Sequence, residues 1–110
     1  MNARKLIEDE VLRWVGDIDP SELLRYVKEQ VDVSAEIERS MNLEPWMIRM
    51  GKAMIGRQGQ EELRNMTDAD LDSLLRRIMR TYGNKGLIIW QSKSWFFQQV
   101  YRIRDRFLAA

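Results

Sequence analysis

Apolar residues recur at helical spacing along most of the chain, beginning with residues 4–15. Four apolar side chains in that segment fall at i, i+4, i+7 and i+8, and these are Ile7, Val11, Trp14 and Val15. This spacing is typical of an amphipathic helix that buries one face. The pattern predicts a first helix that ends near Gly16.

A second helix is predicted to begin at Pro20. Asp19 is a good N-cap acceptor, and proline is favoured at the first helical position. One apolar stripe then continues toward Asn42 through Leu23, Val27, Val31, Ile37 and Met41. Two interpretations stay open: one helix to Asn42, or two shorter helices that meet near residues 32–34.

A third helix is predicted from Pro45 to about Gly56. The side chains expected to form its apolar face are Trp46, Met47, Met50, Ala53 and Met54. Residues 56–59, with the sequence Gly-Arg-Gln-Gly, are typical of a turn because glycine interrupts helices. A short helix is expected to follow over residues 60–65.

The clearest helix start in the sequence lies at Thr67. Thr67 and Asp70 form the pattern of a capping box, and Met66 and Leu71 occupy the positions of a hydrophobic staple. The helix that follows is expected to end at Gly83, since glycine is favoured just past a helix C-terminus. Its predicted core face is Leu71, Leu74, Leu75, Ile78 and Tyr82.

Residues 83–86 are expected to form a turn, and residues 87–108 a final helix with a wide apolar arc. That arc comprises Ile89, Trp90, Phe96, Phe97, Val100, Tyr101, Ile103, Phe107 and Leu108. A helix that is apolar over so much of its surface belongs at the centre of a bundle. The predicted fold is therefore all-α: a compact bundle of five to six helices in a single helical domain over residues 1–110, with a central, aromatic-rich C-terminal helix.

The composition argues against catalysis. The chain contains no cysteine and no histidine, so thiolate chemistry, disulfides and the commonest general base and metal ligand are all excluded. Asp68, Asp70 and Asp72 alternate like the opening of a calcium loop, but Ser73 and Met79 stand where that loop needs glycine and glutamate. These acids are better explained as the first turn of a helix. The protein is expected to be no enzyme and to need no cofactor and no metal.

The location of the protein is also an expectation from composition. No apolar run approaches the roughly 20 residues that span a bilayer. Acidic residues interrupt the N-terminal apolar residues too early for a signal-peptide core. A cytoplasmic protein without a membrane span is therefore expected.

Charge is distributed unevenly along the chain. Residues 1–44 carry six Lys or Arg and eleven Asp or Glu, a net charge of −5, whereas residues 76–110 carry eight basic residues and one acid, a net charge of +7. Such a division indicates either a charged partner or an internal match between the two halves.

The final helix contains the residues expected at an interface. Ile88 and Trp95 fall outside its apolar arc, on the side that carries Arg102 and Arg106. A tryptophan on a polar helix face is a candidate contact for another chain, although it can also cover a neighbouring helix. The predicted function is a non-catalytic interaction or regulatory module that binds another protein or forms a homodimer.

Nucleic-acid binding is the alternative function. Residues 54–63, with Gly-Arg-Gln-Gly at their centre, resemble the Gly-x-x-Gly loop by which KH domains clamp a nucleic-acid backbone. A KH domain also has a three-stranded sheet, and the helical pattern of residues 71–82 stands where strands would follow, so only the loop is compared. The phosphate contacts expected for this alternative are Arg57, Gln58, Arg76, Arg77 and Arg80.

Overall fold

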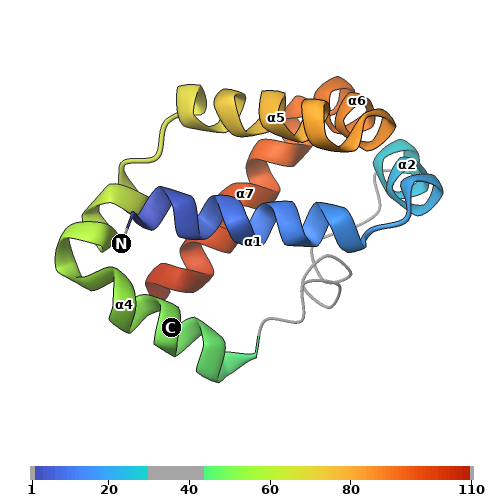
Figure 1. Ribbon diagram of the computed structural model, residues 1–110. Coiled ribbons are helices and arrows are strands. Elements are labelled where there is room, and N and C mark those ends of the chain that lie inside the picture. The colour runs from blue at the N-terminus through green and yellow to red at the C-terminus, as the bar shows by residue number, and fades with distance from the viewer. Residues whose placement is uncertain (1, 30–43, 110) are drawn as a thin grey trace.

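The computed structural model describes residues 2–29 and 44–109, and these ranges form six helices and no strand (Figure 1). This confirms the predicted all-α bundle. The helices are α1 (Ala3–Asp17), α2 (Pro20–Glu29), α4 (Pro45–Arg64), α5 (Asp68–Tyr82), α6 (Asn84–Gln91) and α7 (Lys93–Ala109). The predicted continuation of the second helix toward Asn42 lies outside the described residues.

The centre of the bundle is formed by α1 and α7. Figure 1 shows α1 crossing α7, with α5 on one side of α1 and α4 on the other. α1 packs on α4, α5 and α7. α7 packs on α1, α4, α5 and α6. The side chains of α7 that these contacts bury are Phe96, Gln99, Val100, Ile103 and Phe107. The C-terminal helix is therefore as central as its wide apolar arc predicted.

The helix predicted over residues 87–108 is two helices, α6 and α7, which meet at Ser92. The Ser92 N–H donates to the carbonyls of Ile88 and Ile89 at 3.2 and 3.0 Å, which closes α6. α6 also packs against α5 at very short range: a Cβ on Gly86 would lie 2.7 Å from the backbone N of Met79. The prediction of a single helix was wrong, because the apolar periodicity of one segment carries no information about tertiary packing.

The turn before α6 is shorter than predicted. Gly83 ends α5 with a positive φ of 55°, and α6 begins at the next residue, Asn84. A single glycine thus makes the turn that was expected to take residues 83–86. Glycine suits this position because it has no Cβ to oppose a positive φ.

α4 continues as a helix through residues 56–59, where a turn was predicted. Its backbone departs from helical geometry at Gly56, with φ 67° and ψ −174°, a conformation that is essentially restricted to glycine. The helix bends there and resumes at once. The prediction of an interruption at Gly56 followed by a second helical segment is confirmed, and only the length of the turn was wrong, because Gly56 alone makes the break that was expected to take residues 56–59.

The N-terminus of α5 has the predicted capping box. The Thr67 N–H donates to Asp70 Oδ2 at 2.8 Å, and the Asp70 N–H donates to Thr67 Oγ1 at 3.3 Å. Met66 and Leu71 are both buried, as a hydrophobic staple requires. These interactions are local in sequence, so the pattern alone was sufficient to locate this helix start.

Side chains from the second half of the chain hold the C-terminal end of α1. The Tyr82 hydroxyl donates to the carbonyl of Leu12 at 3.0 Å. Lys85 Nζ donates to the carbonyls of Val15 and Gly16, each at 3.1 Å. A cation at the last carbonyls of a helix is favourable both as a cap and for the helix dipole.

Candidate interaction surfaces

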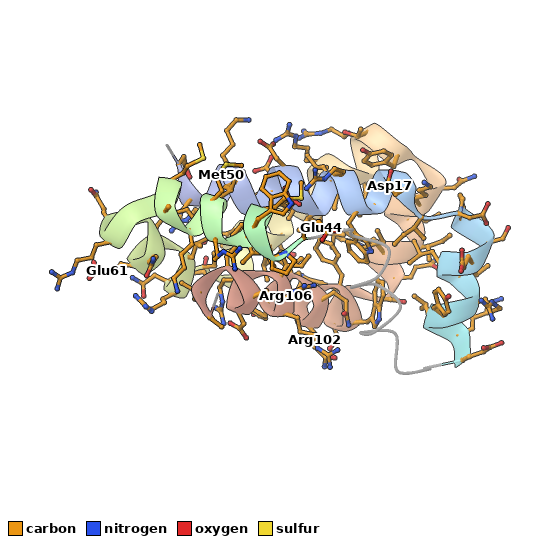
Figure 2. All side chains as sticks on the ribbon, turned by 90° about the horizontal axis from the view of Figure 1, so that it is seen from below. Asp17, Glu44, Met50, Glu61, Arg102 and Arg106 are labelled. Carbon is orange, nitrogen blue, oxygen red and sulfur yellow. The ribbon has the colours of Figure 1, made fainter. Side chains whose placement is uncertain are left out.

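α4 turns a row of large apolar side chains toward solvent. Trp46, Met50 and Met54 are 54%, 51% and 51% exposed, and Ala53 beside them is exposed as well. The three large residues are spaced at i, i+4 and i+8, so they form one ridge along the helix. Figure 2 shows Met50 on the side of α4 that points away from α7. We call Trp46, Met50, Ala53 and Met54 the α4 outer face.

The apolar face predicted for this helix is not the side that packs on the core. The residues that α4 buries are Ile48, Gly51, Ile55, Gly59 and Leu63. Of the residues predicted on the apolar face, Met47 is half-buried, and Trp46, Met50, Ala53 and Met54 are the α4 outer face. The buried side was not recognised because glycine counts as neither apolar nor large in a periodicity argument.

Two glycines explain why this side of α4 faces inward. A Cβ on Gly51 would lie 2.7 Å from Phe107 Cε1 of α7, so the α4 backbone approaches α7 as closely as only glycine allows. A Cβ on Gly59 would be in ordinary contact with the Cβ of Ala3 of α1, at 3.5 Å, but would clash with the Ile55 side chain of α4 itself. Glycines at regular helical spacing with Ile48 and Ile55 were the signal in the sequence that would have identified the buried side.

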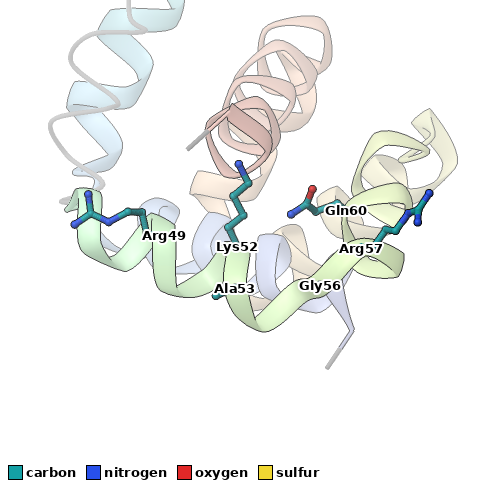
Figure 3. A pocket seen from close by; sticks show the side chains of 6 residues that line it. All are labelled: Arg49, Lys52, Ala53, Gly56, Arg57 and Gln60. Atoms are coloured by element: carbon teal, nitrogen blue, oxygen red, sulfur yellow. The ribbon is translucent and has the colours of Figure 1, made fainter.

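Basic side chains border the α4 outer face. Residues 45–60 contain Arg49, Lys52 and Arg57 and no Asp or Glu. A hollow of about 490 Å³ lies at the bend of α4, and Ala53 of the outer face is part of its lining. Figure 3 shows Arg49 and Arg57 at the two ends of this hollow, with Lys52 between them. Among the described residues, neither Arg49 nor Arg57 has an ion-pair partner.

The interface residues predicted on the C-terminal helices differ in exposure. Ile88 of α6 and Trp95 of α7 are half-buried and packed against the core. The Trp95 ring centroid lies 6.0 Å from that of Trp14, which is fully buried in α1. Arg102 is exposed, Arg106 is half-buried, and Figure 2 labels both on α7. Trp95 thus packs inside the bundle, and a smaller fraction of its side chain is exposed to a partner than of the Trp46 side chain.

The predicted phosphate contacts lie on two separate helices. Arg57 and Gln58 are exposed on α4 just after its bend, and Arg76, Arg77 and Arg80 are exposed on α5. Figure 1 shows α4 and α5 on opposite sides of α1. The structure therefore does not bring the two groups together into one basic site.

The basic residues of α5 have different environments. Arg77 forms an ion pair with Glu8 of α1, so its charge is matched within the molecule. The Arg76 guanidinium lies 5.6 Å from the centroid of the Trp90 ring, a cation–π distance. Arg80 is exposed and has no ion-pair partner among the described residues. A hollow of about 330 Å³ is lined by Arg76, Met79, Arg80 and Trp90.

The uneven charge of the two halves is matched internally only in part. Within residues 2–29 and 44–109, the pair of Arg77 with Glu8 is the one ion pair that joins the acidic first part of the chain to the basic last third. Lys93 instead pairs with Asp72 at 2.6 Å, and Arg104 with its neighbour Asp105 at 2.8 Å. Basic groups such as Arg80 and Arg102 therefore remain on the surface.

Two tyrosine hydroxyls donate to carboxylates. The Tyr101 hydroxyl donates to Asp68 Oδ1 at 2.7 Å, and this hydrogen bond raises the pKa of Tyr101. The Tyr26 hydroxyl donates to Glu22 Oε1 at 2.8 Å, which raises the pKa of Tyr26 in the same way. Both acceptors stabilise the protonated phenol, so neither tyrosine is prepared to act as a phenolate.

The described residues also lack two other kinds of feature. No group of three acidic side chains there has the geometry to hold a metal ion. No described helix combines the length and the apolar character needed to cross a bilayer.

No protein-family model, curated protein or solved structure matches this chain. The surfaces described above are thus the basis for a functional proposal.

Proposed function

We propose that this protein is a non-catalytic helical module that binds another protein through the α4 outer face. The observation that carries the proposal is the exposure of Trp46, Met50 and Met54 on one ridge of a single helix. Large apolar side chains that gather on a surface mark sites of interaction. Tryptophan is enriched among the residues that dominate binding energy, and methionine adapts its shape to a partner.

The proposal moves the expected interface from α7 to α4. Trp95 packs against Trp14, so its removal would disturb the core as well as any interface. Trp46 and Met50 are about half exposed and can be replaced with little effect on folding. A homodimer is one form that such binding could take, and it is tested by the same experiment.

Site-specific photocrosslinking tests this proposal directly. A photoreactive amino acid at position 50 should produce a crosslinked species of higher mass in extracts of the native host. The same amino acid at position 98, where Gln98 is exposed on α7, is the control and should produce much less. Equal crosslinking at both positions, or none at position 50, would contradict binding at α4. A product with twice the mass of the chain would identify self-association.

A second candidate function is nucleic-acid binding by α5 and α6. The observation that favours it is the exposed group of Arg76 and Arg80 beside Trp90, which combines phosphate-binding cations with an aromatic ring. Arg77 contributes less to this surface because it is paired with Glu8.

The salt dependence of binding tests this second function. Anisotropy of labelled single-stranded RNA should show binding at about 50 mM salt that weakens steeply by about 200 mM, because phosphate contacts release counterions. Replacing both Arg76 and Arg80 by alanine should abolish it, whereas Arg102→Ala on α7 is the control. Absence of binding at the lower salt concentration would exclude this function.

A further inference from the structure

We infer that the partner segment bound by the α4 outer face is an amphipathic helix with acidic residues beside its apolar stripe. This inference rests on the proposed function and adds the chemistry of the partner to it. Three properties of the surface support it: the shape of the ridge, the sign of the charge beside it and the charges at its two ends.

The shape of the α4 outer face suits another helix. Trp46, Met50 and Met54 follow the i±4 row of α4, the kind of ridge that fits into the groove between two rows of a neighbouring helix. A helix that presents apolar side chains at i, i+3, i+4 and i+7 would cover such a ridge along its length. An extended strand would find no sheet edge here, since α4 already satisfies its own backbone hydrogen bonds.

The charge beside the ridge specifies acidic residues on the partner. Arg49 lies on α4 at one end of the hollow that Ala53 also lines. Arg57 lies beyond the bend, at the other end of this hollow (Figure 3). Both arginines lack an ion-pair partner among the described residues. Carboxylates on a bound helix would form charge-assisted hydrogen bonds with these guanidinium groups.

Acidic residues at either end of the ridge argue against an anionic membrane surface. Glu44 is exposed immediately before α4, and Glu61 is exposed in its second half, as Figure 2 shows. An anionic surface that approached α4 along its whole length would meet these carboxylates as well as the arginines, and the carboxylates would oppose its binding. A narrow helix can instead lie along the basic part of the face alone.

The basic residues of α4 argue against a second copy of this chain as the partner. A two-fold interface uses the same patch on both subunits. Pairing two α4 outer faces would place Arg49 and Arg57 of one copy near the same residues of the other, with no acid from either copy between residues 45 and 60. Juxtaposed like charges disfavour such an interface.

Selection from a displayed library of random peptides tests the inference. The peptides should be about 16 residues long, enough for roughly four helical turns. The full chain should enrich peptides with apolar residues at helical spacing and with Asp or Glu beside them. A synthetic peptide from this selection should bind Met50→Glu at least about tenfold more weakly, the effect of losing one central contact. Arg80→Glu, a charge reversal at an exposed arginine of α5, is the control and should leave the affinity unchanged.

Charge reversal tests the acidic character of the partner. The double variant Arg49→Glu, Arg57→Glu should bind the selected acidic peptide about tenfold more weakly than the unmodified chain. A peptide in which lysine replaces each acid should bind the double variant more tightly than the original peptide does. Circular dichroism should confirm that each variant keeps its helical content.

The possible outcomes separate this inference from the proposed function. Peptides that depend on Met50 but lack acidic residues would overturn the inference and leave protein binding by α4 in place. Failure to enrich any Met50-dependent peptide would overturn the inference and, with negative crosslinking at position 50, the proposed function too. Trp46-dependent binding to phosphatidylserine-containing vesicles, but not to phosphatidylcholine vesicles, would replace it by membrane binding. A dimer by light scattering that Met50→Glu dissociates would replace it by self-association.

Discussion

α1 and α4 pack against each other and both contact α7, yet they distribute their apolar residues in opposite ways. α1 buries its whole apolar stripe, including Trp14. α4 places Gly51 and Gly59 toward the core and leaves Trp46 and Met50 in solvent. Close backbone approach at Gly51 and burial of Ile48, Ile55 and Leu63 together make the inner side of α4, and Trp46 and Met50 are then left outside the core. Residues that stabilise the fold are therefore distinct from residues that are exposed for binding.

Replacing one tryptophan in each helix should give the largest difference between them. Trp14→Ala removes a fully buried ring that contacts Trp95, and it should lower the free energy of unfolding by about 3–5 kcal/mol. Trp46→Ala, at a site that is 54% exposed, should change it by no more than about 0.5 kcal/mol. Urea denaturation followed by circular dichroism measures both. Similar losses in the two variants would show that α4 contributes to the core as α1 does.

The bend in α4 should be the next most sensitive position. Gly56→Ala forces a side chain into backbone angles that are essentially restricted to glycine, so it should lower the free energy of unfolding by about 1–3 kcal/mol. Gln58→Ala, two residues later at an exposed helical position, is the matched control and should have little effect. Equal stability of Gly56→Ala and the control in thermal denaturation would mean that the bend is not required for α4 to pack on α1 and α7.

The cap at the end of α1 should contribute less. Lys85→Met removes the ammonium that donates to the carbonyls of Val15 and Gly16, and it should lower the free energy of unfolding by about 1 kcal/mol. Arg80→Met removes an exposed cation of α5 that has no ion-pair partner among the described residues, so it should be nearly neutral. Chemical denaturation of both variants compares them, and a neutral Lys85→Met would show that water caps α1 equally well.

The smallest effect is expected where α7 meets α5. Tyr101→Phe removes the hydrogen bond to Asp68 and should lower the free energy of unfolding by about 0.5–1 kcal/mol. Because this bond raises the pKa of Tyr101 in the folded state, its contribution is fully present below the unfolded pKa of about 10 and is lost as pH rises through the folded value. Denaturation at neutral pH and above about pH 10 should show the two proteins converging at high pH. A constant difference would assign the effect to packing.

Helix starts and interruptions that depend on neighbouring residues could be predicted from the sequence. The capping box of Thr67 and Asp70 involves residues three apart, and it located α5 correctly. The bend at Gly56 was also located, but not its length, because one residue with unusual angles replaces a whole turn. The division at Ser92 was missed, since the residues around it have no glycine or proline that would indicate a helix end.

The candidate interface was harder to predict than the fold. Trp46 and Met50 were predicted on one apolar face of a helix, but the sequence did not show that this face is exposed, because helical periodicity gives the width of an apolar arc and not the part of it that faces inward. That choice depends on the contacts of Gly51 and Gly59 with α7 and α1. Trp95 is the opposite case. It was predicted at an interface because it lies among polar residues, and its packing against Trp14 could not be predicted from the sequence.

The hydrogen bonds from Tyr82 and Lys85 to α1 also constrain the order in which the chain can fold. They join residues separated by 69 or 70 positions, and such long-range contacts form late because they must close a long loop. α1 is made before the helices that cover it, so its apolar stripe cannot be shielded until α5 and α7 have been synthesised. During translation the apolar stripe of α1 therefore stays exposed until these later helices can pack on it.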